Sequence, residues 1–223
     1  MTHTPLSRVD KFLAGVSSRP QQRGNLIFGL DATASRERTW DTAAQLQAQM
    51  FREVAVIGAL DMQLVYYRGI VECKASRWVD NPMALATVMR KIQCEAGETQ
   101  INRILIHASR ETKLRKINAL VFIGDACEEN SDSLVEPAAE LAKLDVPAFM
   151  FQEGNDLVAQ KVFQSIARTT HGAYHRFDRA SAQQFAELLR AVAAFAVGGV
   201  VALERQGSAA ARLLLGQVKG KDD

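Results

Sequence analysis

Short apolar runs alternate with amphipathic segments along most of the chain. Residues 25–30 and 119–123 are almost entirely apolar, as expected of strands buried on both faces of a parallel sheet. Two further strand patterns occupy 146–151 and 173–177. Because strands that alternate with helices favour right-handed crossovers, the pattern predicts a mostly parallel sheet. Apolar residues at helical spacing predict the helices, at 37–51, 82–93, 100–115, 132–143, 156–169 and 181–203.

A β-rich stretch after the first predicted helix breaks this alternation. It begins as one long strand, 54–67, bent at Gly58, and Arg68-Gly69 then turns the chain into a second strand at 70–75. Such a hairpin adds an antiparallel edge to an otherwise parallel sheet. We therefore predict a doubly wound, Rossmann-like α/β fold with six strands in the order 3-2-1-4-5-6, one antiparallel edge strand, and helices on both faces.

The two ends of the chain differ from this pattern. Residues 1–21 form a polar extension with one short amphipathic helix and without the apolar core of a signal peptide. Residues 204–223 form a charged C-terminal tail with a short helical piece, which leaves 22–203 as the main domain. The longest apolar run, 191–203, is shorter than the roughly 20 residues of a membrane span. We therefore expect a buried or partner-facing helix there, and no membrane partner.

The bulk composition narrows the function classes. Of the 223 residues, 48% are hydrophobic, which is enough for a full core. The 27 basic and 25 acidic residues nearly balance, so charge gives no argument for binding nucleic acid or an anionic membrane. The three cysteines, Cys73, Cys94 and Cys127, form no Cys-x-x-Cys pair and suit a reducing cytoplasm, which is the predicted location.

Three oxygen-bearing side chains stand at alternate positions where the first apolar run stops. Asp31, Thr33 and Ser35 leave the predicted strand at its carboxyl end, where open α/β sheets bind ligands. One carboxylate and two hydroxyls are ligands that a hard cation such as Mg²⁺ accepts. The same residues also suit an Asx or Ser/Thr turn that caps the next helix. The stretch alone does not decide between the two interpretations.

This stretch resembles the Asp-x-Ser/Thr-x-Ser signature of the von Willebrand factor A domain, whose metal-ion-dependent adhesion site holds Mg²⁺ or Mn²⁺. Two later segments also resemble the family: Gly97-Glu-Thr99 matches its Gly-x-Thr pattern, and Val121-Phe-Ile-Gly-Asp125 matches the strand that usually ends in Thr-Asp-Gly. The resemblance covers 22–203 and points to an intracellular, bacterial-type member with a single such domain. It implies a metal, Mg²⁺ with Mn²⁺ or Ca²⁺ as alternatives, held by Asp31, Thr33, Ser35, Thr99 and Asp125.

The sequence departs from the family pattern in two places. Thr33 stands where Ser is commoner, which keeps an oxygen ligand. Ala126 replaces the Gly expected after Asp125, and Gly124 precedes the Asp instead, which alters the conformational freedom of that loop. Four charged residues flank the implied site and form the predicted partner-binding rim: Arg36, Arg38, Glu128 and Glu129.

The resemblance implies a protein-interaction module rather than an enzyme. In the family, an Asp or Glu of a protein partner fills an open coordination position of the metal. Two alternatives stay open. One is a metal-independent scaffold that binds through another surface, such as the apolar C-terminal helix. The other is a phosphatase-like hydrolase with Asp31 as nucleophile, although the haloacid-dehalogenase pattern needs a second Asp where this chain has Thr33.

Overall fold

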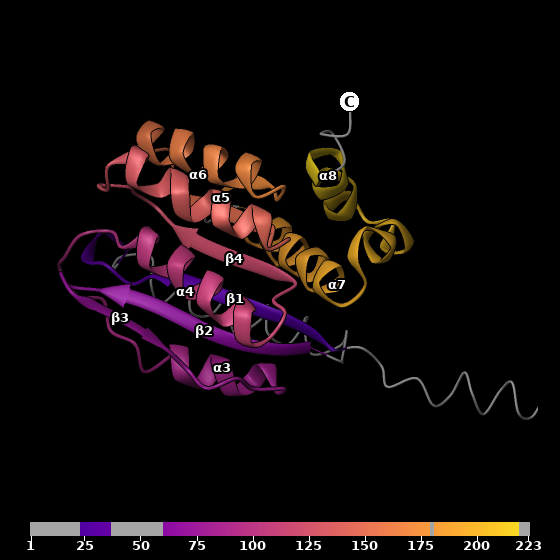
Figure 1. Cartoon of the computed structure of the whole chain (residues 1–223), viewed down its shortest axis with the longest axis horizontal. Coiled ribbons are helices and arrows are strands. Elements are labelled where there is room, and N and C mark those ends of the chain that lie inside the picture. The colour runs from indigo at the N-terminus through magenta and orange to yellow at the C-terminus, as the bar shows by residue number, and fades with distance from the viewer. Residues whose placement is uncertain (1–22, 37–59, 179–180, 219–223) are drawn as a thin grey trace, which may run out of the picture.

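A single mixed sheet organises the chain (Figure 1). The computed structural model describes residues 23–36, 60–178 and 181–218. Within them, six strands lie in the order β3-β2-β1-β4-β5-β6, with β3 antiparallel and the others parallel. The predicted fold class and strand order are therefore confirmed. The strands are β1 (Gly24–Asp31), β2 (Leu60–Arg68), β3 (Glu72–Ala75), β4 (Ala119–Gly124), β5 (Ala148–Glu153) and β6 (Tyr174–Phe177).

Helices cover both faces of this sheet (Figure 1). Helices α4, α5 and α6 pack on one face, and α3 and α7 pack on the other. Two short 3₁₀ turns, η1 (Ala34–Arg36) and η2 (Ser131–Leu134), follow the carboxyl ends of β1 and β4. The helices are α3 (Pro82–Met89), α4 (Ile101–Leu114), α5 (Val135–Lys143), α6 (Leu157–Thr169), α7 (Ala182–Gln206) and α8 (Ala209–Val218).

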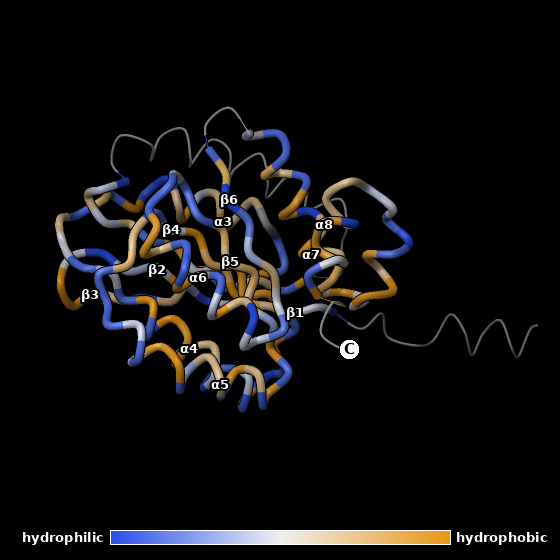
Figure 2. The backbone as a smooth tube through the Cα atoms, turned by 90° about the horizontal axis from the view of Figure 1, so that it is seen from above, coloured by the Kyte–Doolittle hydropathy of each residue, from blue (hydrophilic) through white to orange (hydrophobic). Residues whose placement is uncertain are grey.

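The core consists of two apolar layers separated by the sheet, because successive side chains of a strand point to opposite faces. In β1, Leu26, Phe28 and Leu30 contribute to the layer under α3 and α7, whereas Ile27 contributes to the layer under α4, α5 and α6. Burial on both faces explains why β1 reads as a nearly continuous apolar run. Hydrophobic colours accordingly run through the centre of the sheet in Figure 2.

Local capping groups begin two helices where the sequence predicts. The side chain of Asn81 accepts a hydrogen bond from the backbone N–H of Met83 at 2.9 Å and starts α3. The Asp156 carboxylate accepts from the N–H of Ala159 at 2.6 Å and starts α6. Each bond satisfies a donor that the first helical turn leaves without a partner. Helix α3 ends at Met89, earlier than the predicted end at residue 93.

Two predicted elements begin later than expected. Gly69 adopts a positive φ of 59°, so residues 69–71 form the turn and β3 begins only at Glu72. The α-helix predicted from residue 132 begins at Val135, after η2. Pro137 explains this delay, because it has no N–H to bond the carbonyl of Ser133 four residues earlier. That carbonyl instead accepts a hydrogen bond from the Asn102 amide at 3.0 Å.

Helix α7 is a core helix with a kink. Gly198 and Gly199 leave the helical conformation, and Gly199 has a φ of 61°. Residues 183–206 are the one described segment that is long and apolar enough to cross a membrane, and 44% of its most apolar window is buried in the fold. Gly24, at the start of β1, lets this helix approach closely, because a Cβ there would lie 2.4 Å from the Ala196 carbonyl oxygen.

Helix α8 returns along the end of α7 and reaches the open edge of the sheet. It extends from Ala209 to Val218, beyond the predicted piece at 209–215, and its Leu214 is buried in the same apolar layer as α7. The Gln217 side-chain amide accepts from the N–H of Tyr174 at 2.9 Å and donates to the Tyr174 carbonyl at 3.1 Å. Tyr174 belongs to the edge strand β6, so Gln217 occupies the outward backbone groups of that residue.

Several sequence predictions lie outside the described residues. They are the short helix within 1–21, the helix at 37–51, residues 54–59 of the long strand, and Arg38. The predicted domain limits at 22 and 203 stay predictions.

Candidate metal centre

The candidate site is built on the loop that follows β1. Asp31 is the last residue of that strand, and its side chain is fully buried. Its Oδ1 atom accepts hydrogen bonds from the backbone N–H of Thr33 at 2.8 Å and from the Thr33 hydroxyl at 2.7 Å. The loop is thus closed by a local turn of the Asx kind, as one of the two interpretations of the sequence predicts. This turn also fixes the Asp31 carboxylate beside the Thr33 hydroxyl.

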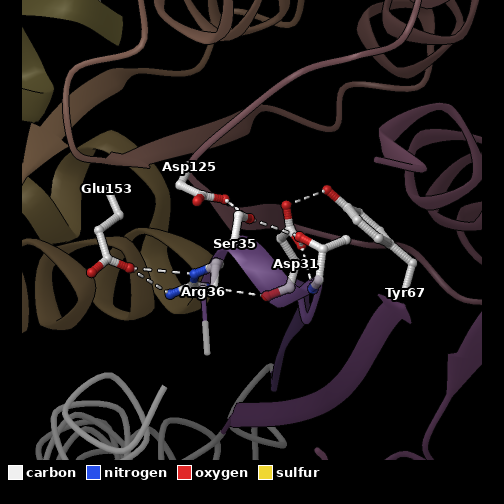
Figure 3. A network of polar contacts seen from close by, with 7 residues as sticks. Asp31, Ser35, Arg36, Tyr67, Asp125 and Glu153 are labelled. Atoms are coloured by element: carbon white, nitrogen blue, oxygen red, sulfur yellow. Dashed lines mark hydrogen bonds and ion pairs between the residues drawn. The ribbon is translucent and has the colours of Figure 1, made fainter. Parts of the chain in front are cut away.

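A chain of oxygen atoms leads from Asp31 to the end of β4 (Figure 3). The Thr33 Oγ1 and Ser35 Oγ atoms lie 3.0 Å apart, and the Ser35 hydroxyl donates to Asp125 Oδ1 at 3.1 Å. Strands β1 and β4 are neighbours, which brings Asp31 and Asp125 to the same edge of the sheet. Four of the five predicted ligand residues therefore form one connected group.

Gly124 leaves room for the Phe122 ring of its own strand. A Cβ at this position would lie 2.9 Å from the Phe122 ring and 3.5 Å from the Asp31 Cβ. The family pattern has its Gly after the Asp, whereas this chain has Gly124 before Asp125 and Ala126 after it. Asp125 still reaches Ser35, so the altered order does not remove it from the group.

Thr99, the fifth predicted ligand, is tied to the loop after β4. Its hydroxyl accepts from the N–H of Glu128 at 2.9 Å, and its own N–H donates to Glu128 Oε2 at 2.9 Å. Glu128 lies three residues beyond Asp125, so this reciprocal pair joins the two loops. In the described part of the chain, no hydrogen bond links Thr99 directly to the other four residues. Its hydroxyl oxygen keeps a second lone pair that can bind a cation.

The segment before Thr99 is also anchored to its neighbours. The N–H of Glu95 donates to the Ala32 carbonyl at 3.1 Å, next to the candidate loop. Gly97 lies directly against the turn after β2, because a Cβ there would be 1.9 Å from the Gly69 carbonyl oxygen. Backbone contacts therefore hold the Thr99 loop against the segments that follow β1 and β2.

Arg36 is not part of an exposed rim, contrary to the prediction. Its guanidinium is fully buried and forms an ion pair with Glu153, with Nη2 and Oε2 at 3.0 Å (Figure 3). Its Nη1 also donates to the Asp31 carbonyl at 2.9 Å. Because η1 turns Arg36 back under the loop toward the end of β5, the side chain supports the site from beneath. It does not face a partner.

Glu128 and Glu129, which the sequence places in the predicted rim, bond to the backbone around the start of α4. Glu128 is exposed but bonds to Thr99, as described above. The Glu129 carboxylate accepts from the backbone N–H groups of Ile101, at 2.5 Å, and Asn102, at 3.0 Å. These donors belong to the first turn of α4, whose partial positive charge favours a carboxylate. Both glutamates therefore organise the start of α4 as well as adding negative charge near the site.

Tyr67 is a site residue that the sequence reasoning missed. Its hydroxyl donates to Asp31 Oδ2 at 3.0 Å, and its ring is fully buried against Phe122. The resemblance of residues 63–69 to a strand of the family was visible in the sequence, but that likeness assigned the tyrosine no role. Tyr66 and Tyr67 are consecutive residues of one strand, so their rings point to opposite faces of the sheet. This alternation alone does not tell which ring lies beside Asp31.

Burial dominates the electrostatics of the two carboxylates. It raises the pKa of Asp31, although the hydrogen bonds of Thr33 and the charge of Arg36 act in the opposite direction. Burial likewise raises the pKa of Asp125, against the effects of Ser35 and Arg36. A buried and a half-buried carboxylate at one edge of the sheet favour a cation nearby.

The oxygen atoms present fit a hard divalent cation. Two ligands at adjacent corners of a Mg²⁺ octahedron, with bonds of about 2.1 Å, lie about 3.0 Å apart. The Thr33 and Ser35 hydroxyls are hydrogen-bonded to each other at 3.0 Å, a separation that two such adjacent ligands would also have. No group of three or more His, Cys, Asp or Glu side chains within residues 23–36, 60–178 and 181–218 forms a metal cluster. A cation here would therefore depend on these hydroxyls, with Asp31 and Asp125 supplying the negative charge.

The architecture is that of the von Willebrand factor A domain, and comparison with solved structures supports this assignment. The chain is similar to a von Willebrand factor type A protein from Catenulispora acidiphila, with a TM-score of 0.66 and 16% identity over 79% of this chain and 43% of that one. It is also similar to the SpRpn10 VWA domain, with a TM-score of 0.54 and 14% identity over 70% of this chain and 87% of that one.

A third similar structure is an aerotolerance-related membrane protein from Bacteroides fragilis, with a TM-score of 0.58 and 16% identity over 75% of this chain and 98% of that one. Identities of this size show a common fold. Comparison with protein-family models and with curated proteins gave no match. The chain spans less than half of the Catenulispora protein, so the activity of that whole protein is not transferred. The fold predicted from the sequence resemblance is confirmed.

Proposed function

We propose that this protein is a protein-interaction module that depends on a divalent metal. The fold is commonly used for protein interaction. Mg²⁺, or else Mn²⁺ or Ca²⁺, is held by Asp31, Thr33, Ser35, Thr99 and Asp125, and an Asp or Glu of a protein partner completes the coordination. The observation that carries the proposal is the hydroxyl pair of Thr33 and Ser35, set at 3.0 Å between the buried Asp31 carboxylate and the half-buried Asp125 carboxylate.

The arrangement of Asp31 supports an open coordination position. Its two carboxylate oxygens already accept hydrogen bonds from Thr33 and Tyr67, which spread its negative charge. The Thr33 and Ser35 hydroxyls are neutral ligands. A cation at this place is therefore incompletely neutralised by the protein, and a carboxylate from outside is a favourable additional ligand. Ser35 lies on the exposed side of the loop, where such a carboxylate has access.

The same loop supports a non-catalytic role. A phosphatase-like reaction with Asp31 as nucleophile needs a second acid that protonates the leaving group. Residue 33 is a threonine, so an acid two residues later is lacking. We therefore place the protein among binding modules. The free thiols of Cys73, Cys94 and Cys127 support a cytoplasmic location.

Calorimetric titration with Mg²⁺ and Mn²⁺ tests the metal site. We expect the wild type to bind and Ser35→Ala, which changes an exposed side chain, to bind about tenfold more weakly or worse, because a ligand is lost. Ser165→Ala is the matched control, since Ser165 is exposed on α6. Asp31→Asn should abolish binding, with its folding checked by circular dichroism. Equal affinity of wild type and Ser35→Ala would contradict the proposed site.

A pull-down from native cytoplasm, performed with Mg²⁺ and again with EDTA, tests whether the metal is used in recognition. The metal-bridged module should recover partners only with Mg²⁺, and Ser35→Ala should recover less of them. Recovery of the same proteins under both conditions would favour the metal-independent scaffold instead.

A further inference from the structure

We infer that the partner segment carries one carboxylate flanked by branched or long apolar side chains, which bind two exposed apolar pairs, Ile70–Val71 and Leu157–Val158. The inference rests on the metal-bridged function proposed above and specifies the partner for that site. In Ile70 and Val71 the exposed fractions are 74% and 75%, and in Leu157 and Val158 they are 69% and 57%. Such large exposed apolar side chains beside a candidate site favour an interaction surface.

Both pairs lie at the same edge of the sheet as the candidate loop. Ile70 and Val71 form the turn after the carboxyl end of β2, and Leu157 and Val158 form the first turn of α6 after the carboxyl end of β5. Because β1, β2 and β5 are parallel, their carboxyl ends share one edge with Asp31. In the strand order, β1 stands between β2 on one side and β4 and β5 on the other. The two pairs therefore flank the loop from opposite sides.

The turn after β2 is held in place by its neighbours. The Arg103 guanidinium donates to the Val71 carbonyl at 2.5 Å, and the Gln100 amide donates to the Gly69 carbonyl at 3.2 Å. The close backbone contact of Gly97 with Gly69 fixes the other side of the turn. Ile70 and Val71 are thus presented to solvent by an ordered backbone, which lowers the entropy cost of binding.

The first turn of α6 is held in a similar way. The Asp156 carboxylate caps the helix through the N–H of Ala159, and the Gln152 amide donates to the Asp156 carbonyl at 2.7 Å. Gln152 itself is fully buried at the end of β5. The capped turn leaves Leu157 and Val158 exposed on a rigid support.

The spacing of the strands sets the length of the segment. Neighbouring strands lie about 4.8 Å apart, so β2 and β5, three positions apart in the sheet, are separated by about 14 Å. An extended chain covers about 3.3 Å per residue, so about four residues span this distance. The carboxylate should stand one or two residues from the apolar side chain over β2 and about three from the one over β5.

The charge around the site selects a single carboxylate over an acidic tract. Glu95, Glu98 and Glu128 are exposed near the Thr99 loop, and Asp156 is exposed at the start of α6. These carboxylates repel a strongly acidic segment, whereas the metal attracts one carboxylate locally. The remaining affinity must then come from apolar contact, which the two exposed pairs provide.

Fluorescence anisotropy with labelled peptides tests this inference. One peptide carries a single Asp between Leu residues at the spacing above. A second has Ser in place of each Leu. A third keeps the Asp and the Leu residues and has Glu at the other positions. In Mg²⁺ the first should bind about tenfold or more tightly than the second, because the removal of Leu side chains from water favours binding. The Glu-rich peptide should bind more weakly than the first, and EDTA should abolish binding of all three.

Two double variants test the protein side: Ile70→Ser with Val71→Ser, and Leu157→Ser with Val158→Ser. Each should weaken binding of the Leu peptide about tenfold and leave Mg²⁺ affinity unchanged. Leu114→Ser is the matched control, since Leu114 is 84% exposed at the end of α4, on the opposite edge of the sheet. It should bind as the wild type does.

The outcomes separate this inference from the proposed function. Mg²⁺ binding by the wild type together with equal affinity for the Leu and Ser peptides would overturn the inference alone. Unchanged peptide binding in both double variants, or no Mg²⁺-dependent peptide binding at all, would also overturn it. Failure of the wild type to bind Mg²⁺ would overturn the proposed function, and this inference with it.

Discussion

The Arg36 guanidinium and the Glu153 carboxylate form a buried ion pair directly beneath the candidate metal loop, with Nη2 and Oε2 at 3.0 Å. The guanidinium also binds the Asp31 carbonyl, so one side chain connects the end of β5 with the end of β1. The pair places a positive charge close to a cation site and a carboxylate beside it that offsets this charge. Its integrity is therefore expected to matter for both stability and metal binding.

Removing one partner of this pair should strongly destabilise the protein. Arg36→Met removes the guanidinium that pairs with the buried Glu153 carboxylate, and we expect a loss of about 3–5 kcal/mol in the free energy of unfolding. Urea unfolding measures this loss. Arg23→Met is the control, because Arg23 pairs with Asp61 in a much more exposed position and should cost less than about 1 kcal/mol. Equal losses in the two variants would contradict the buried role of Arg36.

Tyr67→Phe should destabilise the protein by removing a donor from a buried carboxylate. A hydrogen bond to a charged group contributes about 1.5–3 kcal/mol, and the Asp31 Oδ2 atom would lose this one. The neighbouring Tyr66→Phe is a matched control. The Tyr66 hydroxyl bonds the partly exposed Glu72, so its loss should cost less than about 1 kcal/mol. Chemical denaturation measures the free energy of unfolding of both variants. A smaller loss for Tyr67→Phe than for Tyr66→Phe would contradict the role given to the Tyr67–Asp31 hydrogen bond.

Acidification should weaken Mg²⁺ binding. Burial raises the folded-state pKa of both Asp31 and Asp125, so protons compete with the cation at a higher pH than at an exposed carboxyl of pKa about 4. Without metal, a carboxyl with a raised folded pKa contributes stability that is fully present below about pH 4 and lost as the pH rises through that pKa. The metal-free protein should therefore gain stability from these two groups on mild acidification.

Thermal unfolding across a pH series, with Mg²⁺ and with EDTA, measures both effects. The increase in Tm caused by Mg²⁺ should be largest at neutral pH and should shrink toward about pH 5 as protons displace the cation. An increase that stays constant over this range would show that the two carboxylates do not hold the metal.

Gly97→Ala should disturb the Thr99 loop. The new Cβ would meet the Gly69 carbonyl oxygen at 1.9 Å, so one backbone segment must move, at a cost of about 1–3 kcal/mol. Because Thr99 is two residues away, Mg²⁺ affinity should fall as well. Gly216→Ala is the control: its Cβ meets nothing within 4 Å in helix α8, and it should be neutral or stabilising by up to about 1 kcal/mol. Titration calorimetry and denaturation give both quantities.

The strand pattern of the sequence was sufficient to predict the sheet, because burial on two faces leaves a nearly continuous apolar run in β1 and β4. The helices between the runs predicted parallel strands, the order was that of a doubly wound fold, and the short turn at Gly69 predicted the antiparallel edge. Boundaries were less accurate where one residue overrides periodicity. Pro137 delays the start of α5 by removing a donor, and nothing in hydrophobic spacing reports such a loss.

The candidate site was only partly predictable from the sequence. Asp31, Thr33, Ser35 and Asp125 are brought together as the resemblance implied, because they follow adjacent parallel strands. Arg36 was misplaced because a charged side chain in a loop is usually exposed, and its buried partner Glu153 lies 117 residues away. Long-range pairs of this kind leave no local pattern. The metal and the partner stay predictions.

The two hydrogen bonds between the Gln217 side chain and the Tyr174 backbone occupy part of the edge of the sheet at β6. An edge strand normally offers its backbone to any extended chain, including another copy of the same protein. Here a side chain from the last described helix supplies the donor and the acceptor that a seventh strand would bring at that residue. Helix α8 thus limits the pairing of a further strand with β6 at Tyr174.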